Sequence, residues 1–288
     1  MAKKFKILGI VILIIMLFAV GLTGCIFYEN YNVKITDYTI VSNKITSLEN
    51  GGKIAVIADF HNSENYNKII DKTKKAAPDV IIIAGDFVNM NDTNFSNAEK
   101  LMIGLVNIAP VYFVSGNHER WLKVGEENFL DKVKKLGANI LNQNIAEVAI
   151  KQGKITITGY QDIIYSDNDI RVEYLNAQLE GLYSRLTDEQ KSMFNLLVFH
   201  RGNLLHNAAR QPYDLIVSGH LHGGQINIPK IRETVVKEKV GSSEFVKGYY
   251  NVDGVKAIIS GGLENNSEIK RLFNMPEIVM ITLKSIKD

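Results

Sequence analysis

Five of the six histidines in this chain lie in short motifs that also contain two aspartates and an asparagine. In chain order the motifs are Asp59-Phe60-His61, Gly85-Asp86, Gly116-Asn117-His118-Glu119, His200, and Gly219-His220-Leu221-His222. Carboxylate, amide and imidazole groups suit divalent Mn, Fe and Zn, and the lack of a cysteine among them argues against a structural thiolate site. A carboxylate between two ions about 3.5–4 Å apart could bridge them. The motifs therefore predict a centre for two metal ions.

Each motif directly follows a short apolar run that we expect to form a buried strand. These runs are residues 54–58, 80–84, 111–114, 196–199 and 215–217. Because ligands of α/β proteins bind where the carboxyl ends of strands and their loops converge, the motifs should meet at one rim. A lone Asp-x-His or Gly-Asp is usually only a turn, so the shared placement carries the prediction. The sixth histidine, His206, has no motif around it and is expected on a solvated helix.

The elements between the motifs predict an α/β fold of two packed sheets, a β-sandwich flanked by helices. Helical segments are expected at 64–77, 95–108, 126–136 and 171–194. Further strands are expected at 139–141, 147–150, 155–158, 255–260 and 278–283. Alternating strands and helices in the first half are typical of a parallel sheet, and the later strands indicate a second sheet. One domain over 53–284, preceded by a connector with the first strands over 29–52, is the expected organisation.

The composition fits one large ordered domain and gives no sign of nucleic-acid binding. The 288 residues are 46% hydrophobic and 22% charged, which supports a substantial core. The net charge of +2 depends on Lys3, Lys4 and Lys6, because without them 30 basic groups face 31 acidic ones. A folded part without a basic bias is not expected to bind nucleic acid. Composition does not fix the oligomeric state.

The N-terminus has the pattern of a membrane segment, which occupies residues 1–28. Ile7 to Tyr28 is an uncharged stretch of 22 residues that follows three lysines. It is long enough for an uncleaved signal anchor. Alternatively, Leu22-Thr23-Gly24-Cys25 is typical of a lipobox, with the chain's single cysteine, Cys25, as the lipidated residue. Both interpretations hold the domain at the membrane on the extracytoplasmic side.

In this order the motifs resemble those of the calcineurin-like metallophosphoesterases. The run Gly223-Gly224-Gln225-Ile226 after the last motif is similar to that of the membrane-tethered bacterial phosphodiesterases of this family. Arg271-Leu272-Phe273 and Pro276-Glu277-Ile278 also resemble the ending of that subgroup. The resemblance covers residues 53–284, and it implies the fold of the metal-dependent phosphatases.

The resemblance also implies a role for each motif residue. One metal ion would be held by Asp59, His61, Asp86 and His222, and the second by the bridging Asp86 together with Asn117, His200 and His220. A hydroxide between the metals would be the nucleophile, and His118 would act as general acid.

Two positions depart from the family pattern. Asn89 stands where many members carry an acid that orients the catalytic histidine, which predicts a weaker general acid at His118. Arg201 precedes Gly202 where proline is common, and it is either a substrate-phosphate ligand or a surface arginine. Trp121 either walls the pocket or, as we expect, packs in the core.

The sequence thus predicts a phosphoester hydrolase, preferably a phosphodiesterase, acting outside the cytoplasmic membrane with two ions of Mn, Fe or Zn. A lipid or cell-envelope substrate would fit the membrane tether. The alternatives are a pyrophosphatase acting on a lipid-linked nucleotide sugar and, from another class, a non-catalytic binding module.

Overall fold

The computed structural model describes residues 2–45, 51–151, 153–163, 171–228, 230–232, 236, 244–265 and 267–286. Residues 46–50 of the expected segment 29–52 lie outside the described residues, as do residues 164–170, which precede the expected segment 171–194. The described residues form two six-stranded sheets flanked by helices, which confirms the predicted fold class.

The first sheet has the strand order β1-β12-β2-β3-β4-β5. Its strands are β1 (Lys34–Ser42), β2 (Gly52–Ile57), β3 (Val80–Ala84), β4 (Val111–Val114), β5 (Asn139–Ile140) and β12 (Glu277–Ser285). Strands β2 to β5 pair in parallel, so their carboxyl ends lie at one edge. Strand β12 runs antiparallel to β2 and parallel to β1.

The second sheet has the order β10-β11-β9-β8-β7-β6. Its strands are β6 (Asn144–Ile150), β7 (Gly153–Tyr160), β8 (Phe194–Arg201), β9 (Leu215–Gly219), β10 (Gly248–Val252) and β11 (Val255–Ile259). The four inner strands pair in parallel, and β6 and β10 run antiparallel at the two edges. Strand β10 escaped prediction because Gly248-Tyr249-Tyr250-Asn251 lacks an apolar run.

The central strands are buried on both faces, which explains their unbroken apolar sequences. In β2, Ile54 and Val56 point between the two sheets, where Leu196 and Val217 meet them. The alternate residues of β2, such as Ile57, face the helical layer on the outer side. Successive side chains of each central strand therefore point to opposite faces of the sheet and pack in two different hydrophobic cores.

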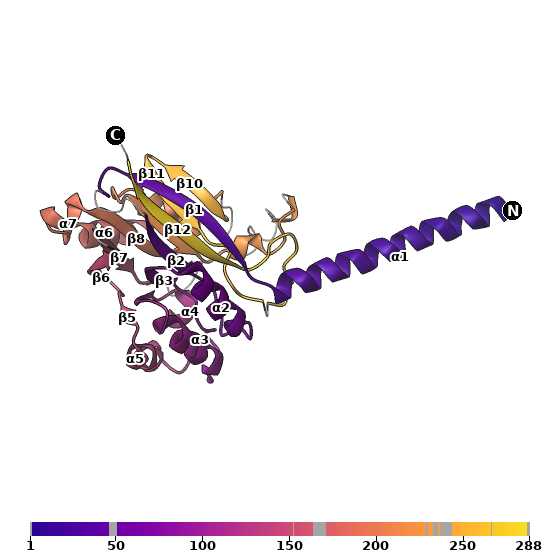
Figure 1. Cartoon of the computed structure of the whole chain (residues 1–288), viewed down its shortest axis with the longest axis horizontal. Helices are drawn as coiled ribbons and strands as arrows, with labels where there is room; N and C mark the ends of the chain where they lie inside the picture. Colours follow the sequence, from indigo (N-terminus) through magenta and orange to yellow (C-terminus); the bar gives the residue numbers. More distant parts are fainter. Residues whose placement is uncertain are drawn as a thin grey trace.

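Helices cover the outer face of each sheet (Figure 1). The first sheet is covered by α2 (Tyr66–Ala76), α3 (Ser96–Val106) and α5 (Glu126–Lys135), with the short α4 (Asn117–Arg120) at the rim. The second sheet is covered by α6 (Val172–Ser184) and α8 (Leu205–Ala208), and α7 (Asp188–Ser192) contacts β8. Helix α2 ends in a left-handed Ala77, directly before Pro78, as the sequence predicts.

Helix α1 (Ala2–Tyr31) projects from the domain as a long rod (Figure 1). Its span Lys3–Tyr31 is long and apolar enough to cross a membrane, and none of its most apolar window is buried in the protein. The helix continues about one turn beyond the predicted boundary at residue 28. The reason is that Asn30 is buried against the domain, where its side chain bonds the backbone of Arg271.

Candidate metal centre

The five predicted motifs meet at the carboxyl ends of five strands. Asp59 follows β2, Asp86 follows β3, Asn117 follows β4, His200 lies at the end of β8 and His220 follows β9. Several of these residues adopt left-handed backbone conformations: Asp59, His61, Asp86, His220 and His222 have φ between 50° and 81°. Such conformations cost energy in non-glycine residues and concentrate at functional sites. Sharp turns at the strand ends thus aim the side chains inward.

Two groups of side chains at this rim could each hold a metal ion. The first comprises Asp59, His61, Asp86 and His222, and the second comprises Asp86, His200 and His220, with ligand atoms within 4.8 Å of one another in each group. Asp86 belongs to both groups. Asn117 joins the second, because its Oδ1 lies 3.2 Å from His200 Nε2. The structure therefore brings together every residue that the sequence predicts to bind metal.

The spacing of these atoms fits metal coordination. His200 Nε2 lies 3.1 Å from Asp86 Oδ2, and His61 Nε2 lies 3.3 Å from His222 Nε2. Metal–ligand bonds of about 2.0–2.2 Å place neighbouring ligand atoms roughly 3–3.5 Å apart. The His61 Nε2 to Asp86 Oδ2 distance is slightly longer, at 3.8 Å.

Three of the four clustered imidazoles are oriented through Nδ1. His61 Nδ1 lies 3.0 Å from Asn89 Oδ1, and His222 Nδ1 lies 2.6 Å from Glu264 Oε2. His200 Nδ1 lies 2.7 Å from the carbonyl oxygen of Ala84. An acceptor at Nδ1 fixes the proton there, so the lone pair of Nε2 points to the shared centre. This arrangement suits neutral imidazole ligands.

Glu264 is a functional residue that sequence reasoning missed. It follows the carboxyl end of β11 by five residues, in the segment Ser260-Gly261-Gly262-Leu263-Glu264. The strand was predicted over 255–260, but Glu264 stands four residues beyond it and belongs to none of the motifs. The end of a further strand at this rim is the sequence signal for Glu264, and it does not reveal that the carboxylate contacts His222.

Asn89 contacts a different histidine from the one that the sequence predicts. Asn89 was expected to orient His118, but its Oδ1 contacts His61 and its Nδ2 donates to the backbone oxygen of His61 at 2.9 Å. His118 Nδ1 instead accepts the backbone N–H of Met90 at 3.2 Å. The left-handed turns at His61 and Asp86 bring the 61 and 89 loops together, which spacing in the sequence does not reveal.

Burial and nearby charges shift the pKa values of the clustered side chains. Burial raises the pKa of Asp59 to about 6, although His200 acts in the opposite direction. Burial also lowers the pKa of His61 to about 4. Burial disfavours a charged His200, but the carboxylates of Asp86 and Asp59 raise its pKa to about 10. Shifts of this kind in a buried cluster are typical of functional sites.

Glu119 of the third motif holds two loops together from beneath. Its buried carboxylate accepts the backbone N–H groups of Asp86 at 2.9 Å, Phe87 at 2.7 Å and Gly116 at 2.8 Å. Asp86 in turn accepts the backbone N–H of His118 at 2.8 Å. Glu119 therefore fixes the backbone that carries Asp86 and His118.

A cavity of about 250 Å³ opens onto the clustered side chains. It is lined by residues of both groups and by His118, Trp121, Leu221, Glu264 and Ser267. The His118 ring meets the His61 ring edge-on, with centroids 4.5 Å apart. Trp121 is only half-buried and walls this cavity, so the expectation that it packs in the core is wrong.

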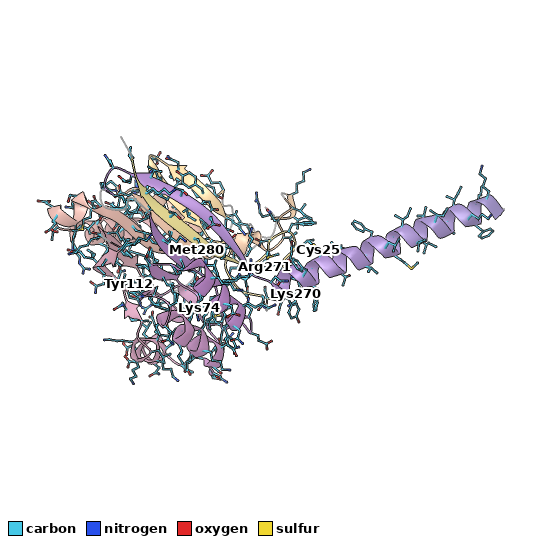
Figure 2. All side chains as sticks on the ribbon, in the orientation of Figure 1. Cys25, Lys74, Tyr112, Lys270, Arg271 and Met280 are labelled. Atoms are coloured by element: carbon cyan, nitrogen blue, oxygen red, sulfur yellow. The ribbon has the colours of Figure 1, made fainter. Side chains whose placement is uncertain are left out.

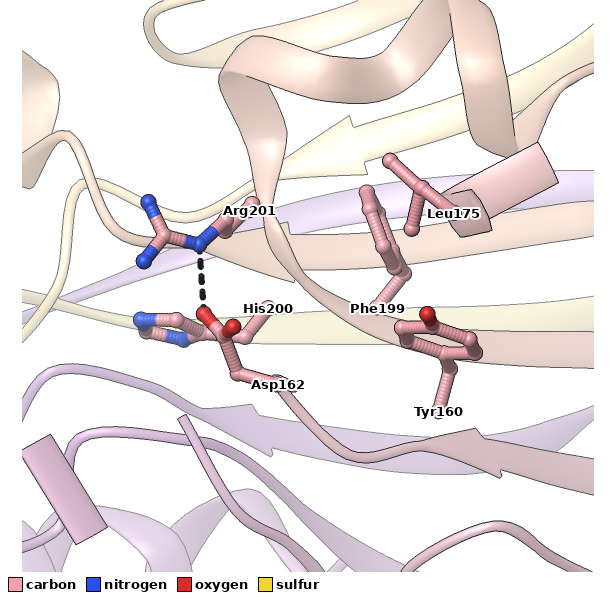
Figure 3. A pocket seen from close by; sticks show the side chains of 6 residues that line it. All are labelled: Tyr160, Asp162, Leu175, Phe199, His200 and Arg201. Atoms are coloured by element: carbon pink, nitrogen blue, oxygen red, sulfur yellow. Dashed lines mark hydrogen bonds and ion pairs between the residues drawn. The ribbon is translucent and has the colours of Figure 1, made fainter. Parts of the chain in front are cut away.

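Arg201 is buried beside the second group and is no surface arginine (Figure 3). Its Nε donates to Asp162 Oδ2 at 2.5 Å, and its Nη1 lies 3.3 Å from His220 Nε2. The guanidinium also lies over the Trp121 ring, 5.8 Å from the centroid. His206 is exposed on α8, as predicted, where Glu244 lies 2.8 Å from its Nε2.

Comparison with known proteins agrees with this geometry. The family model of calcineurin-like phosphoesterases matches residues 52–224, which include all seven predicted metal ligands. An uncharacterised metallophosphoesterase of Bacillus subtilis strain 168 is 25% identical over 269 residues, covering 90% of this chain and 88% of the relative. An uncharacterised metallophosphoesterase of Campylobacter jejuni is 28% identical over 298 residues, covering 100% and 74%. A phosphodiesterase of Escherichia coli strain K12 is 25% identical over 240 residues, covering 80% and 82%.

The chain belongs to the calcineurin-like phosphoesterase family. It is a metal-dependent hydrolase of phosphoric esters, and the buried carboxylates and imidazoles at its rim imply divalent metal ions.

Proposed function

We propose that the protein is a phosphodiesterase that uses two divalent ions and acts outside the cytoplasmic membrane. The observation that carries the proposal is Asp86, which belongs to both ligand groups beneath one cavity. The relative from Escherichia coli that is described as a phosphodiesterase supports the diester preference. Mn, Fe and Zn all suit oxygen and imidazole ligands.

We assign four residues to each ion, with Asp86 shared. The first ion would be held by Asp59, His61, Asp86 and His222, and the second by Asp86, Asn117, His200 and His220. When bound, such ions would polarise the phosphoryl group and lower the pKa of a water molecule.

His118 is placed to donate a hydrogen bond to the leaving alcohol oxygen. Because Met90 N–H donates to its Nδ1, the neutral ring carries its proton on Nε2, within a side chain that lines the cavity. In the hydrolysis, a water oxygen bonds to phosphorus and one ester P–O bond breaks. The Nε2–H of the neutral ring donates a hydrogen bond to the departing alcohol oxygen, and that oxygen is protonated as the attacking water releases a proton. Arg201 supplies positive charge beside His220.

The N-terminus supports an extracytoplasmic domain. Lys3, Lys4 and Lys6 lie in the first turns of α1, ahead of its apolar stretch, and such residues stay in the cytoplasm. Among the described residues, the hydrogen bonds between α1 and the domain are made by Glu29, Asn30 and Tyr31, so they would survive cleavage before Cys25. A Cys25→Ala variant separates the two tethers. Lipidation predicts that this variant accumulates as an unprocessed precursor on gels, whereas a signal anchor predicts unchanged mobility.

The function is tested by metal analysis and turnover of the full-length protein. We expect two ions per chain and faster hydrolysis of bis(p-nitrophenyl) phosphate than of p-nitrophenyl phosphate with at least one of Mn, Fe and Zn. A metal-loaded protein that hydrolyses neither would support a non-catalytic module. Selective cleavage of a lipid-linked nucleotide sugar would favour the pyrophosphatase alternative.

A further inference from the structure

A groove of about 520 Å³ lies where α1 meets the domain. One wall comes from the last turns of α1, with Ile26, Phe27 and Tyr31, and the opposite wall includes Asn265 and Lys270. Figure 2 shows Cys25, Lys270 and Arg271 at this junction. The volume falls within the range of small-molecule sites, about 300–1,000 Å³.

Two segments of chain connect this groove with the metal centre. His61 lines the catalytic cavity, and Glu64, three residues later, lines the groove. In the second segment, Glu264 and Ser267 line the cavity, whereas Asn265 and Lys270 line the groove. The same two segments of chain therefore line both sites.

The groove lies at the level where a bilayer would end. At 1.5 Å per residue, about 20 residues cross a hydrocarbon core of about 30 Å, so a span that starts at Ile7 ends near Ile26. Phe27, Tyr28 and Tyr31 then lie in the interfacial region, where aromatic side chains concentrate. Ile269 and Phe273 on the facing loop are also exposed, with 40% and 53% of their surface accessible.

The charges at the groove suit the headgroup end of an amphiphile. Lys270 is exposed and has no ion-pair partner among the described residues, so it can meet a lipid phosphate. Glu64 is the other charged lining residue. The apolar side chains of the groove belong to the membrane helix itself. Hydrocarbon entering from the bilayer would thus pack against the apolar wall that α1 provides.

We propose that this groove admits a hydrocarbon chain of a membrane lipid whose phosphodiester is hydrolysed at the metal centre. This rests on the phosphodiesterase activity proposed above and names its substrate class. The lipid would remain partly in the bilayer, while α1 and the 264–270 segment guide its headgroup to His118.

The test compares two matched substitutions on one helix in the full-length protein. Ile26→Trp narrows the groove, whereas Ile12→Trp makes the same change in the exposed membrane part of α1. Each is assayed on phosphatidylglycerol in mixed micelles and on bis(p-nitrophenyl) phosphate. We expect Ile26→Trp to lower the ratio of lipid to aryl-diester turnover about tenfold, and Ile12→Trp to leave it unchanged. Equal ratios of lipid to aryl-diester turnover in the two variants would contradict the proposal that the groove binds the lipid.

A binding measurement does not depend on turnover. Phosphatidylglycerol with a diazirine in its acyl chain should crosslink to peptides containing residues 23–31 or 264–270. Crosslinks confined to residues 5–20, or a groove occupied by a second copy of the chain, would contradict the proposal. Wild-type protein that hydrolyses the aryl diester but no lipid would refute the substrate class alone. Failure on both substrates with metals loaded would refute the phosphodiesterase function itself.

Discussion

The two ligand groups share Asp86 but are supported in different ways. In the first group, side chains from distant segments hold the imidazoles: Asn89 contacts His61, and Glu264 contacts His222. In the second group, the backbone oxygen of Ala84 holds His200, and the buried Arg201 contacts His220. The histidines of the first group are therefore supported by two side chains. Those of the second group are supported by a backbone carbonyl oxygen at a strand end and by an arginine in a buried ion pair.

The first group is also tied to α1. The buried Arg271 donates to the backbone oxygens of Glu264 at 2.7 Å and Gly261 at 2.7 Å. Asn30 of α1 bonds both the carbonyl oxygen and the N–H of Arg271, at 2.9 and 3.0 Å. The contacts that hold α1 and the carboxylate that supports His222 thus lie in one segment. The second group has no comparable link to α1 among the described residues.

The largest effect is expected at the residue that both groups share. Asp86→Asn removes a carboxylate from each group, so metal content should fall at both. Turnover should fall by more than the roughly 10–100-fold loss typical of removing an outer partner. Metal analysis and aryl-diester hydrolysis measure this. Asp71→Asn, on the surface of α2, serves as the control for a lost carboxylate. If the Asp86→Asn variant kept both ions, Asp86 would not be a ligand shared by the two groups.

The buried pair beside the second group should matter chiefly for folding. Arg201→Met leaves the carboxylate of Asp162 buried without the guanidinium, and breaking such pairs costs about 3–5 kcal/mol. Thermal unfolding should show a large drop in the single variant. The double variant Arg201→Met/Asp162→Leu should recover much of the loss. A double variant that is no more stable than the single one would contradict this account of the pair.

A smaller and selective effect is expected from Glu264→Gln. The amide keeps a hydrogen bond to His222 but loses the carboxylate charge that makes the imidazole a stronger ligand. Metal affinity should fall about 10–100-fold at one of two sites. Calorimetric titration with Mn should then separate one weakened site from one unchanged site. Equal weakening of both sites would remove the distinction between the groups.

The sequence predicted this rim well because its information is local. Each predicted ligand directly follows an apolar run, and strand ends of a parallel sheet converge by rule. Asn89, Glu264 and Asp162 belong to a second level, where partners are chosen by turn conformation and by long-range contacts. The left-handed turn at His61 and the return of β11 beside β9 decide these contacts. Neither follows from spacing along the chain, so the ligands were predictable and their supports were not.

The smallest effect is expected from Asn89→Asp, which adds the carboxylate that the family resemblance predicts at this position. The new charge should strengthen His61 as a ligand, but the present Nδ2 bond to the His61 oxygen would be lost. The neighbouring Asp92 would also repel the added charge, because its Oδ2 lies 3.5 Å from Asn89 Nδ2. We therefore expect a gain in metal affinity of less than about tenfold, confined to the first group.

The same variant also tests where Asn89 acts. Because Asn89 contacts His61 and not His118, the ratio of rates for poor and activated leaving groups should stay constant. Asn91→Asp adds the same charge at an exposed position nearby and controls for a general electrostatic effect. A selective acceleration of poor leaving groups in Asn89→Asp would place its action on the general acid. The first group would then be supported by Glu264 alone, and the contrast between the two groups would narrow.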